Sequence, residues 1–323
     1  MTMTPSTNAE TPRLEERRQS AQRRASAARQ RRSLGALRVG LGLASRISPA
    51  LGAAMAAQLF TAPPRCPRPR REQALLDQAE PLVLGEDFVA GWRWGEGPAV
   101  ALVHGWAGRG AQLGALVPPL VGAGYSVLSF DAPAHGASKG RRTTVRGFSD
   151  PLLALQARFG SLHAVVAHSF GCLGAAVALQ RGLCARGVVF LAPPANASGA
   201  LGSFAAALAL DASALDRLRR KLEGVTGHRL EDLDARHYGK SMTLPLLVVH
   251  DEDDRDVPLA SGAAVTAHWP GAQLLTTQGL GHYRLLRSDR IAAAVQEFVR
   301  TLPTDAPVER DLGRLLRLDQ LRF

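Results

Sequence analysis

A serine, an acidic cluster and a histidine occur in that order along the chain, and together they could catalyse acyl transfer. Ser169 lies between small residues in the stretch AHSFG, the acids lie in HDEDDRDVP (residues 250–258), and His282 lies in GLGHYR. A serine hydroxyl attacks a carbonyl carbon when a neighbouring histidine takes its proton, and a carboxylate can orient that histidine. These residue types therefore point to nucleophilic catalysis with His282 as the general base.

Ser169 also has a purely structural interpretation, because serine often caps the first turn of a helix. Its flanks predict a sharp strand-to-helix turn. Residues 162–167 form a short apolar run typical of a strand buried on both faces, and the apolar residues after the serine have helical spacing. Ala167 and Gly171 are small enough to let this turn close and to leave the hydroxyl exposed. Ala167 stands where the usual nucleophile signature has glycine, so the other segments of the chain must decide.

Short apolar runs separated mostly by helical patterns predict the elements that position these residues. The runs cover residues 99–103, 126–130, 163–167, 187–191, 245–250 and 272–276. Strands that alternate with helices indicate a parallel sheet with helices on both faces, and such sheets bind ligands beyond the carboxyl ends of their strands. Residues 81–97 are typical of an antiparallel hairpin at the sheet edge, and Ser288 is placed to cap a last helix whose apolar face holds Ile291 and Val295.

From about residue 80 to residue 300 the chain resembles the α/β-hydrolase superfamily of serine hydrolases. The resemblance rests on the HG pair His104-Gly105, on the stretch FDAPAHGAS (130–138) and on Val257-Pro258 after the acidic cluster. It implies the α/β-hydrolase fold, a mostly parallel doubly wound sheet with helices on both faces and a helical lid inserted after strand 6. No cofactor is expected. Glycine is common in the superfamily at positions 134, 167 and 251, where this chain has other residues, but these departures remove no chemical group.

The resemblance also implies roles for individual residues. It places the triad acid at Asp254, three residues before Val257-Pro258, among five neighbouring carboxylates. It assigns the binding of the oxyanion to the backbone N–H groups of Trp106 and Phe170. The expected supporting residues are His104, Gly105, His168 and Gly171. His104 is expected to orient the loop rather than to catalyse, and His168 to be a packed or hydrogen-bonded neighbour of the serine.

The net charge of +11 comes from the amino-terminal part of the chain. Residues 1–71 contain 14 arginines and 3 glutamates, and the rest of the chain carries as many acidic as basic residues. Because the remaining domain shows no basic residues interleaved with aromatic ones, the sequence argues against nucleic-acid binding. The three cysteines form no CxxC pair and no Cys/His cluster with zinc spacing, so we expect free thiols, no metal and a cytoplasmic location.

Four parts are predicted along the chain. Residues 1–33 contain few large apolar side chains and are expected to be a basic disordered arm, and residues 34–72 an apolar helical segment with a Pro-rich linker. Residues 73–303 form the hydrolase domain, with 192–244 as the helical lid, and 304–323 a carboxyl-terminal tail. Charged residues and Pro49 interrupt residues 34–60, which favours helices lying on the domain over a membrane span. The alternative is an interfacial helix whose arginines contact an anionic membrane surface.

The expected substrate is a small-molecule carboxylic ester with an apolar acyl or alcohol part. This expectation rests on the apolar residues of the lid, which are Leu201, Phe204, Leu208 and Leu210. Thioesters, amides and certain C–C bonds remain alternatives for the same residues. A catalytically silent protein of this fold, used for binding, is the alternative from another class, and the intact set of serine, acid and histidine argues against it.

Overall fold

The computed structural model describes residues 34–85 and 89–304 of the 323-residue chain. The described residues form two compact units. The first, the helical unit, contains residues 34–57 and 201–221, and the second, the sheet unit, contains the others. The predicted arm at 1–33 and residues 305–323 of the predicted tail lie outside the described residues.

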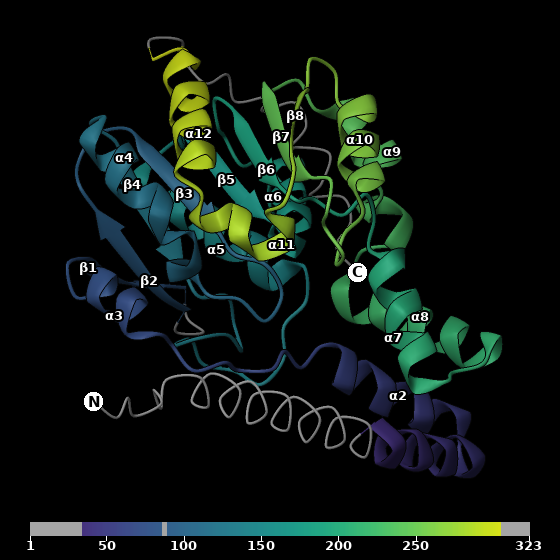
Figure 1. Cartoon of the computed structure of the whole chain (residues 1–323). Coiled ribbons are helices and arrows are strands. Elements are labelled where there is room, and N and C mark those ends of the chain that lie inside the picture. Colours follow the sequence, from purple (N-terminus) through teal and green to yellow (C-terminus); the bar gives the residue numbers. More distant parts are fainter. Residues whose placement is uncertain (1–33, 86–88, 305–323) are drawn as a thin grey trace, which may run out of the picture. The chain divides into compact units, whose positions relative to one another are not determined.

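The sheet unit is built on one eight-stranded sheet in the order β1-β2-β4-β3-β5-β6-β7-β8 (Figure 1). The strands are β1 (Glu80–Leu84), β2 (Val89–Trp94), β3 (Ala99–Val103), β4 (Ser126–Phe130), β5 (Ala164–His168), β6 (Val188–Leu191), β7 (Leu246–Asp251) and β8 (Gln273–Thr277). Strand β2 pairs antiparallel with both β1 and β4, and all other pairs are parallel. The structure confirms the predicted mostly parallel sheet with an antiparallel hairpin at one edge.

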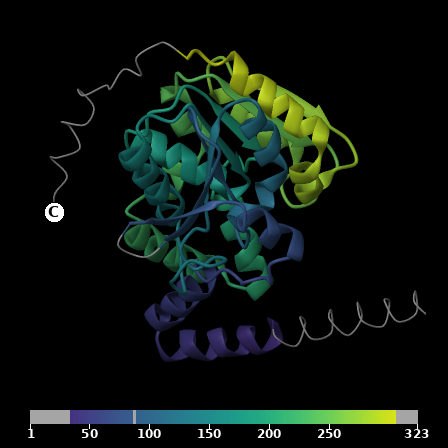
Figure 2. The same ribbon diagram turned by 90° about the vertical axis from the view of Figure 1, so that its left-hand side faces the viewer.

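Helices cover both faces of this sheet. They are α3 (Arg70–Leu76), η1 (Gly110–Leu116), α4 (Val117–Gly122), α5 (Arg146–Phe159), α6 (Phe170–Gln180), α10 (Leu259–His268), α11 (Gly281–Arg284), η4 (Leu285–Arg287) and α12 (Asp289–Thr301). Figure 2 shows the yellow helix α12 and the teal helices on opposite sides of the strands. Ser288 precedes α12 as predicted, but its side chain makes no capping hydrogen bond, so that part of the prediction is wrong.

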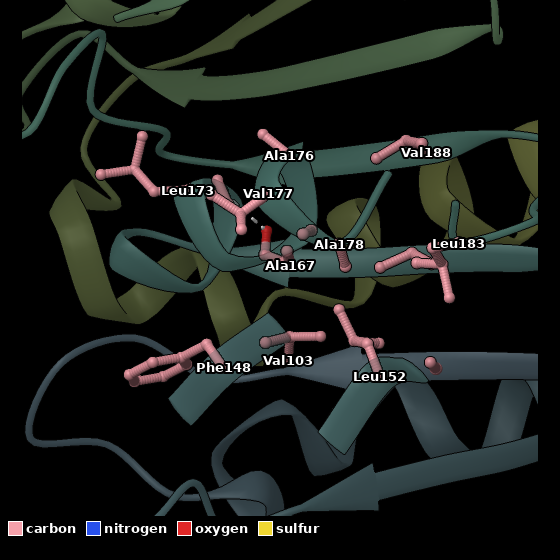
Figure 3. Close-up of a cluster of buried hydrophobic side chains, with 14 of the residues drawn as sticks. Val103, Phe148, Leu152, Ala167, Leu173, Ala176, Val177, Ala178, Leu183 and Val188 are labelled. Atoms are coloured by element: carbon pink, nitrogen blue, oxygen red, sulfur yellow. Dashed lines mark hydrogen bonds between the residues drawn. The ribbon is translucent and has the colours of Figure 1, made fainter. Parts of the chain in front are cut away.

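Alternate side chains of each central strand enter two separate cores. In β3, Ala101 and Val103 join the core under α5 and α6, and Val100 and Leu102 join the core under η1, α4 and α12. Every residue of β3, β4, β5, β6 and β7 is buried, which explains why these strands are recognisable as continuous apolar runs. Figure 3 shows the first core, where Val103 and Ala167 of the sheet lie near Phe148 and Leu152 of α5.

The long connection between β6 and β7 is helical, as its length and composition predict. It contains α7 (Ser198–Leu208), α8 (Ala212–Thr226), η2 (Leu230–Leu233), α9 (Ala235–Tyr238) and η3 (Gly239–Ser241). Residues 201–221 of this connection belong to the helical unit, and the flanking residues belong to the sheet unit.

The helical unit contains helical residues 34–47 and most of α2 (Pro49–Phe60). Within it the Arg38 side chain donates a hydrogen bond to the backbone carbonyl of Ala207 at 3.0 Å. None of the helices in the described residues is both long enough and apolar enough to cross a bilayer.

Candidate active site

Ser169 occupies a strained turn between β5 and α6. Its φ is 52° and its ψ is −125°, a backbone conformation that a residue with a side chain adopts only when the surroundings enforce it. The turn is crowded. A Cβ added to Gly171 would lie 2.4 Å from the carbonyl oxygen of His104, and one added to Gly105 would lie 2.9 Å from Cβ of Ser169. Both predicted supporting glycines are therefore places where β3 and the serine turn approach each other too closely for a side chain.

The structure brings the three predicted triad residues together. His282 Nε2 lies 2.9 Å from Ser169 Oγ, and His282 Nδ1 lies 2.7 Å from Asp254 Oδ2. Asp254 comes from the loop after β7 and His282 from α11, after β8, so three strand ends supply the three side chains. The ionised carboxylate accepts a hydrogen bond from Nδ1–H, which leaves Nε2 as the acceptor for the serine hydroxyl.

The environment of Asp254 favours its ionised form. Its side chain is fully buried, which by itself would raise its pKa, but the hydrogen bonds from His282 and from the N–H of Val257 outweigh burial and lower the pKa below the usual value. The other carboxylate oxygen, Oδ1, accepts hydrogen bonds from the N–H groups of Asp256 and Val257, both at 2.9 Å. The carboxylate that faces His282 is thus negatively charged and held in place at neutral pH.

Asp251 and Asp254 of the acidic cluster have different contacts, which the sequence did not predict. Asp251 is buried. Its carboxylate accepts hydrogen bonds from the Thr277 hydroxyl at 2.7 Å and from the N–H groups of Gly281 at 2.8 Å and Leu280 at 3.0 Å. Asp251 therefore fixes the loop that carries His282, whereas Asp254 contacts the imidazole itself.

Two backbone N–H groups beside the serine are available to an oxyanion. Among the described residues, no acceptor is within hydrogen-bond geometry of the N–H of Trp106 or of Phe170. Phe170 is the first residue of α6, and Trp106 lies in the loop between β3 and η1. Both are the residues that the sequence assigns to an oxyanion hole.

Buried neutral histidines shape the loop around Trp106. His104 Nε2 accepts a hydrogen bond from the N–H of Ala132 at 2.9 Å, so its Nδ1 donates to the carbonyl of Gly105 at 2.7 Å. Burial lowers the pKa of His104 to about 4. His135 Nε2 accepts from the N–H of Ala107 at 3.1 Å, and burial lowers its pKa to about 3. The expectation that His104 orients the loop agrees with these contacts.

His168 packs against the candidate base. Its ring centroid lies 4.7 Å from that of His282, and its Nε2 donates a hydrogen bond to the backbone carbonyl of His282 at 3.0 Å. Burial lowers the pKa of His168 to about 3, so the ring is neutral. The side chain thus lies beside the candidate triad without contacting the serine hydroxyl.

An apolar pocket of about 40 Å³ is bordered by Trp106 and Phe170. It is lined by Phe60, Thr61, Trp106, Thr143, Thr144, Val145, Phe170, Ala197, Leu222, Thr226, Leu230 and Leu233. All of these residues belong to the sheet unit, whereas the residues predicted to bind the apolar group, such as Leu201 and Leu208, belong to the helical unit. No periodic pattern marks the lining, because it is assembled from six separate segments.

In the described part of the chain, Asp254, Asp256 and His282 are the group of acidic and histidine side chains close enough to share a metal ion, with ligand atoms within 4.8 Å of one another. Asp254 and His282 are already hydrogen bonded to each other there. The arrangement thus suits proton transfer from the serine to the histidine, with the carboxylate orienting the imidazole.

Comparisons with known proteins agree with this fold. Residues 100–294 match the family described as "Alpha/beta hydrolase family". The pimeloyl-[acyl-carrier protein] methyl ester esterase of Xanthomonas campestris pv. campestris is 30% identical over 253 residues, which cover 65% of this chain and 98% of that protein. The corresponding esterase of Xanthomonas axonopodis pv. citri is 29% identical over 251 residues, with the same coverage.

Solved structures share the fold at lower identity. The Pyrococcus furiosus esterase Pf2001 superimposes with a TM-score of 0.56 and 22% identity, over 75% of this chain and 99% of that one. A bromoperoxidase from Bacillus anthracis superimposes with a TM-score of 0.54 and 18% identity, over 69% of this chain and 99% of that one.

Proposed function

The chain belongs to the alpha/beta hydrolase family, and on that premise we propose that it hydrolyses carboxylic esters with Ser169 as nucleophile. The observation that carries the proposal is the continuous chain of contacts from Ser169 Oγ through His282 to Asp254, at 2.9 and 2.7 Å. The strained turn at Ser169 supports it, because backbone strain of this kind concentrates at functional sites. Both Xanthomonas relatives are named as methyl ester esterases, which favours esters over amides as the substrate of this chain.

The proposed reaction begins when Ser169 Oγ attacks the ester carbonyl carbon and its proton passes to His282 Nε2. Asp254 stabilises the resulting imidazolium, and the N–H groups of Trp106 and Phe170 bind the oxyanion. Collapse of the tetrahedral intermediate breaks the bond to the alkoxide, which takes the proton from His282. Water then attacks the acyl-enzyme with His282 again as the base, which releases the acid and restores the serine.

The pocket beside the oxyanion residues supports a substrate with a short apolar group. Its walls are mainly aliphatic and aromatic side chains, so burial of an apolar group there is favourable. Its volume of about 40 Å³ is small, which favours a short apolar group over a long alkyl chain. We therefore propose that short acyl or alcohol groups occupy this pocket.

Hydrolysis of p-nitrophenyl esters from acetate to palmitate tests the proposed function. We expect activity that falls with chain length and that drops by several orders of magnitude in Ser169→Ala, because triad residues act as a unit. Ser161→Ala is the matched control, since this serine is exposed and precedes β5. An inactive wild-type protein would instead favour the silent binding protein, and a matching thioester panel would reveal a preference for sulfur leaving groups.

A further inference from the structure

Residues 65–72 precede β1 and lie outside the stretch that matches the family, yet they are fastened to the active-site loops. The Arg65 guanidinium donates to the backbone carbonyls of Ser138 at 2.7 Å, Gly140 at 3.0 Å and Gly136 at 3.1 Å. These carbonyls belong to the loop after β4. One side chain thus binds three backbone carbonyls of that loop.

Arg68 extends the same attachment to a buried carboxylate. Its guanidinium lies 2.8 Å from Oδ2 of Asp131, whose side chain is fully buried, and 5.3 Å from the ring centre of Trp92. The other oxygen, Oδ1 of Asp131, accepts a hydrogen bond from the N–H of Gly110 at 2.8 Å. Asp131 therefore links Arg68 to Gly110, at the end of the loop between β3 and η1 that carries Trp106.

Glu72 binds the adjacent residue of the same loop. Arg109 contacts Glu72 through two nitrogens, with Nη2 at 3.0 Å from Oε1 and Nε bonded to Oε2. Both residues are buried, with exposed fractions of 4% for Glu72 and 6% for Arg109. A bidentate pair of opposite charges fixes orientation as well as distance, and burial shields it from solvent. Removing one partner leaves an uncompensated buried charge.

The oxyanion loop is consequently held at both ends. At its start, Gly105 packs against Ser169, and at its end Arg109 and Gly110 are bound by Glu72 and Asp131. Trp106 lies between these two attachments. The distance from the Trp106 N–H to the serine thus depends on where Glu72 and Asp131 hold the end of the loop.

We propose that Glu72 and Arg68 are positioning residues for this loop, so that residues 65–72 are part of the catalytic machinery although they lie outside the matched domain. Glu72 acts through Arg109, and Arg68 acts through Asp131. The inference rests on the proposed function, because it assumes that the Trp106 N–H binds the oxyanion. Loss of one oxyanion donor lowers kcat by about 10²–10³, and displacement of a donor should cost part of this factor.

Steady-state kinetics of Glu72→Gln on a short p-nitrophenyl ester test the proposal. We expect kcat to fall by about tenfold or more and KM to change less, since the displaced N–H binds the oxyanion only in the transition state. The rate of phosphonylation by a fluorophosphonate should fall in parallel, because that step uses the same donors. Glu80→Gln is the matched control, as Glu80 forms an exposed pair with Arg93 and should keep both constants.

A double variant separates positioning from stability. Glu72→Leu combined with Arg109→Met removes both charges together, and such replacements of buried ion pairs retain or raise stability. We expect its Tm to approach that of the wild type while kcat stays low, because the ion pair no longer fixes residue 109 and only the bond from Gly110 to Asp131 remains at this loop end. A double variant with wild-type Tm and wild-type kcat would overturn the proposal, as would a folded Glu72→Gln with unchanged kcat. Activity that survives Ser169→Ala would instead contradict the proposed function itself.

Discussion

Asp251 accepts a hydrogen bond at 2.8 Å from the N–H of Gly281, the residue that directly precedes His282. Two buried aspartates three positions apart therefore support one histidine in different ways. Asp254 contacts the imidazole, and Asp251 holds the backbone from which the imidazole extends. The two roles should separate in experiments.

Asp254→Asn should lower kcat by about 10⁴, because an amide at this place favours the wrong tautomer of His282. The Tm of this variant should stay close to that of the wild type. Glu252→Gln is the matched control, since the Glu252 side chain is exposed and accepts a hydrogen bond from Gln278 rather than from His282. Near-normal turnover in Asp254→Asn would assign the triad acid to another residue.

Asp251→Asn should act mainly on stability. In the wild type the carboxylate oxygens accept hydrogen bonds from the Thr277 hydroxyl and from two backbone N–H groups. In the variant the amide NH₂ replaces one of these oxygens and cannot accept such a bond. Each buried donor left without a partner costs about 1–3 kcal/mol of stability. For the folded fraction we expect at most about a tenfold loss in kcat, because Asp251 supports the backbone before His282 and not the imidazole itself. Urea unfolding and kinetics on the same sample check both statements.

The folded state should lose stability as the pH falls below neutral. Burial lowers the pKa of His104 to about 4, whereas the unfolded chain has the usual value near 6.5. Between these values the unfolded state binds more protons, so the free energy of unfolding falls as the pH decreases from about 6.5 to about 4. His135 and His168, whose pKa values lie at about 3, act in the same direction.

Urea unfolding at several pH values between 7.5 and 4 measures this dependence. The slope should become shallower in His104→Gln, because one titrating group is removed, even if the variant is less stable at neutral pH. His237→Gln serves as the control, since His237 is exposed. Equal slopes in the wild type and in His104→Gln would contradict the assigned pKa shift.

Gly171→Ala should damage the site through a backbone clash. The added Cβ would lie 2.4 Å from the carbonyl oxygen of His104, so either α6 or the loop after β3 must move. We expect lower stability together with a loss in kcat, because both oxyanion donors border this contact. Gly224→Ala in α8 has open space around the new Cβ and should be neutral or stabilise by up to about 1 kcal/mol.

Leu230→Ala should shift the preference toward longer esters. Leu230 lines the apolar pocket and is only partly buried, so its truncation enlarges the pocket without a large cavity in the core. The ratio of kcat/KM for hexanoate to that for acetate should rise relative to wild type. Val225→Ala is the control, because Val225 is exposed and absent from the lining. An unchanged ratio would place the substrate elsewhere.

The sequence predicted the parts of this fold that have a local signature. The central strands are buried on both faces, so their apolar runs mark them to within one residue, as at β3 and β4. Ser169 and Asp254 each follow such a strand, whereas His282 follows β8, which is mostly exposed. The position of a parallel strand end thus carries most of the information about the candidate triad.

Contacts between distant segments left no such signature. Glu72 and Arg109 are 37 positions apart, and nothing near either residue indicates that they pair in a buried site. The pocket wall contributed by Phe60 and by Thr143, Thr144 and Val145 escaped detection for the same reason. The burial of Asp251 is also invisible in the sequence, because its partners are backbone N–H groups that every residue has.

Labelling with a fluorophosphonate probe tests the central claim most directly. The probe reacts with a serine that is activated by a neighbouring base, so it reports on the nucleophile without knowledge of the natural substrate. Peptide mass spectrometry of the labelled full-length protein should find one modification, at Ser169, and Ser169→Ala should take up none. Modification of a different serine, or an unlabelled Ser169 in a protein that hydrolyses esters, would contradict the account.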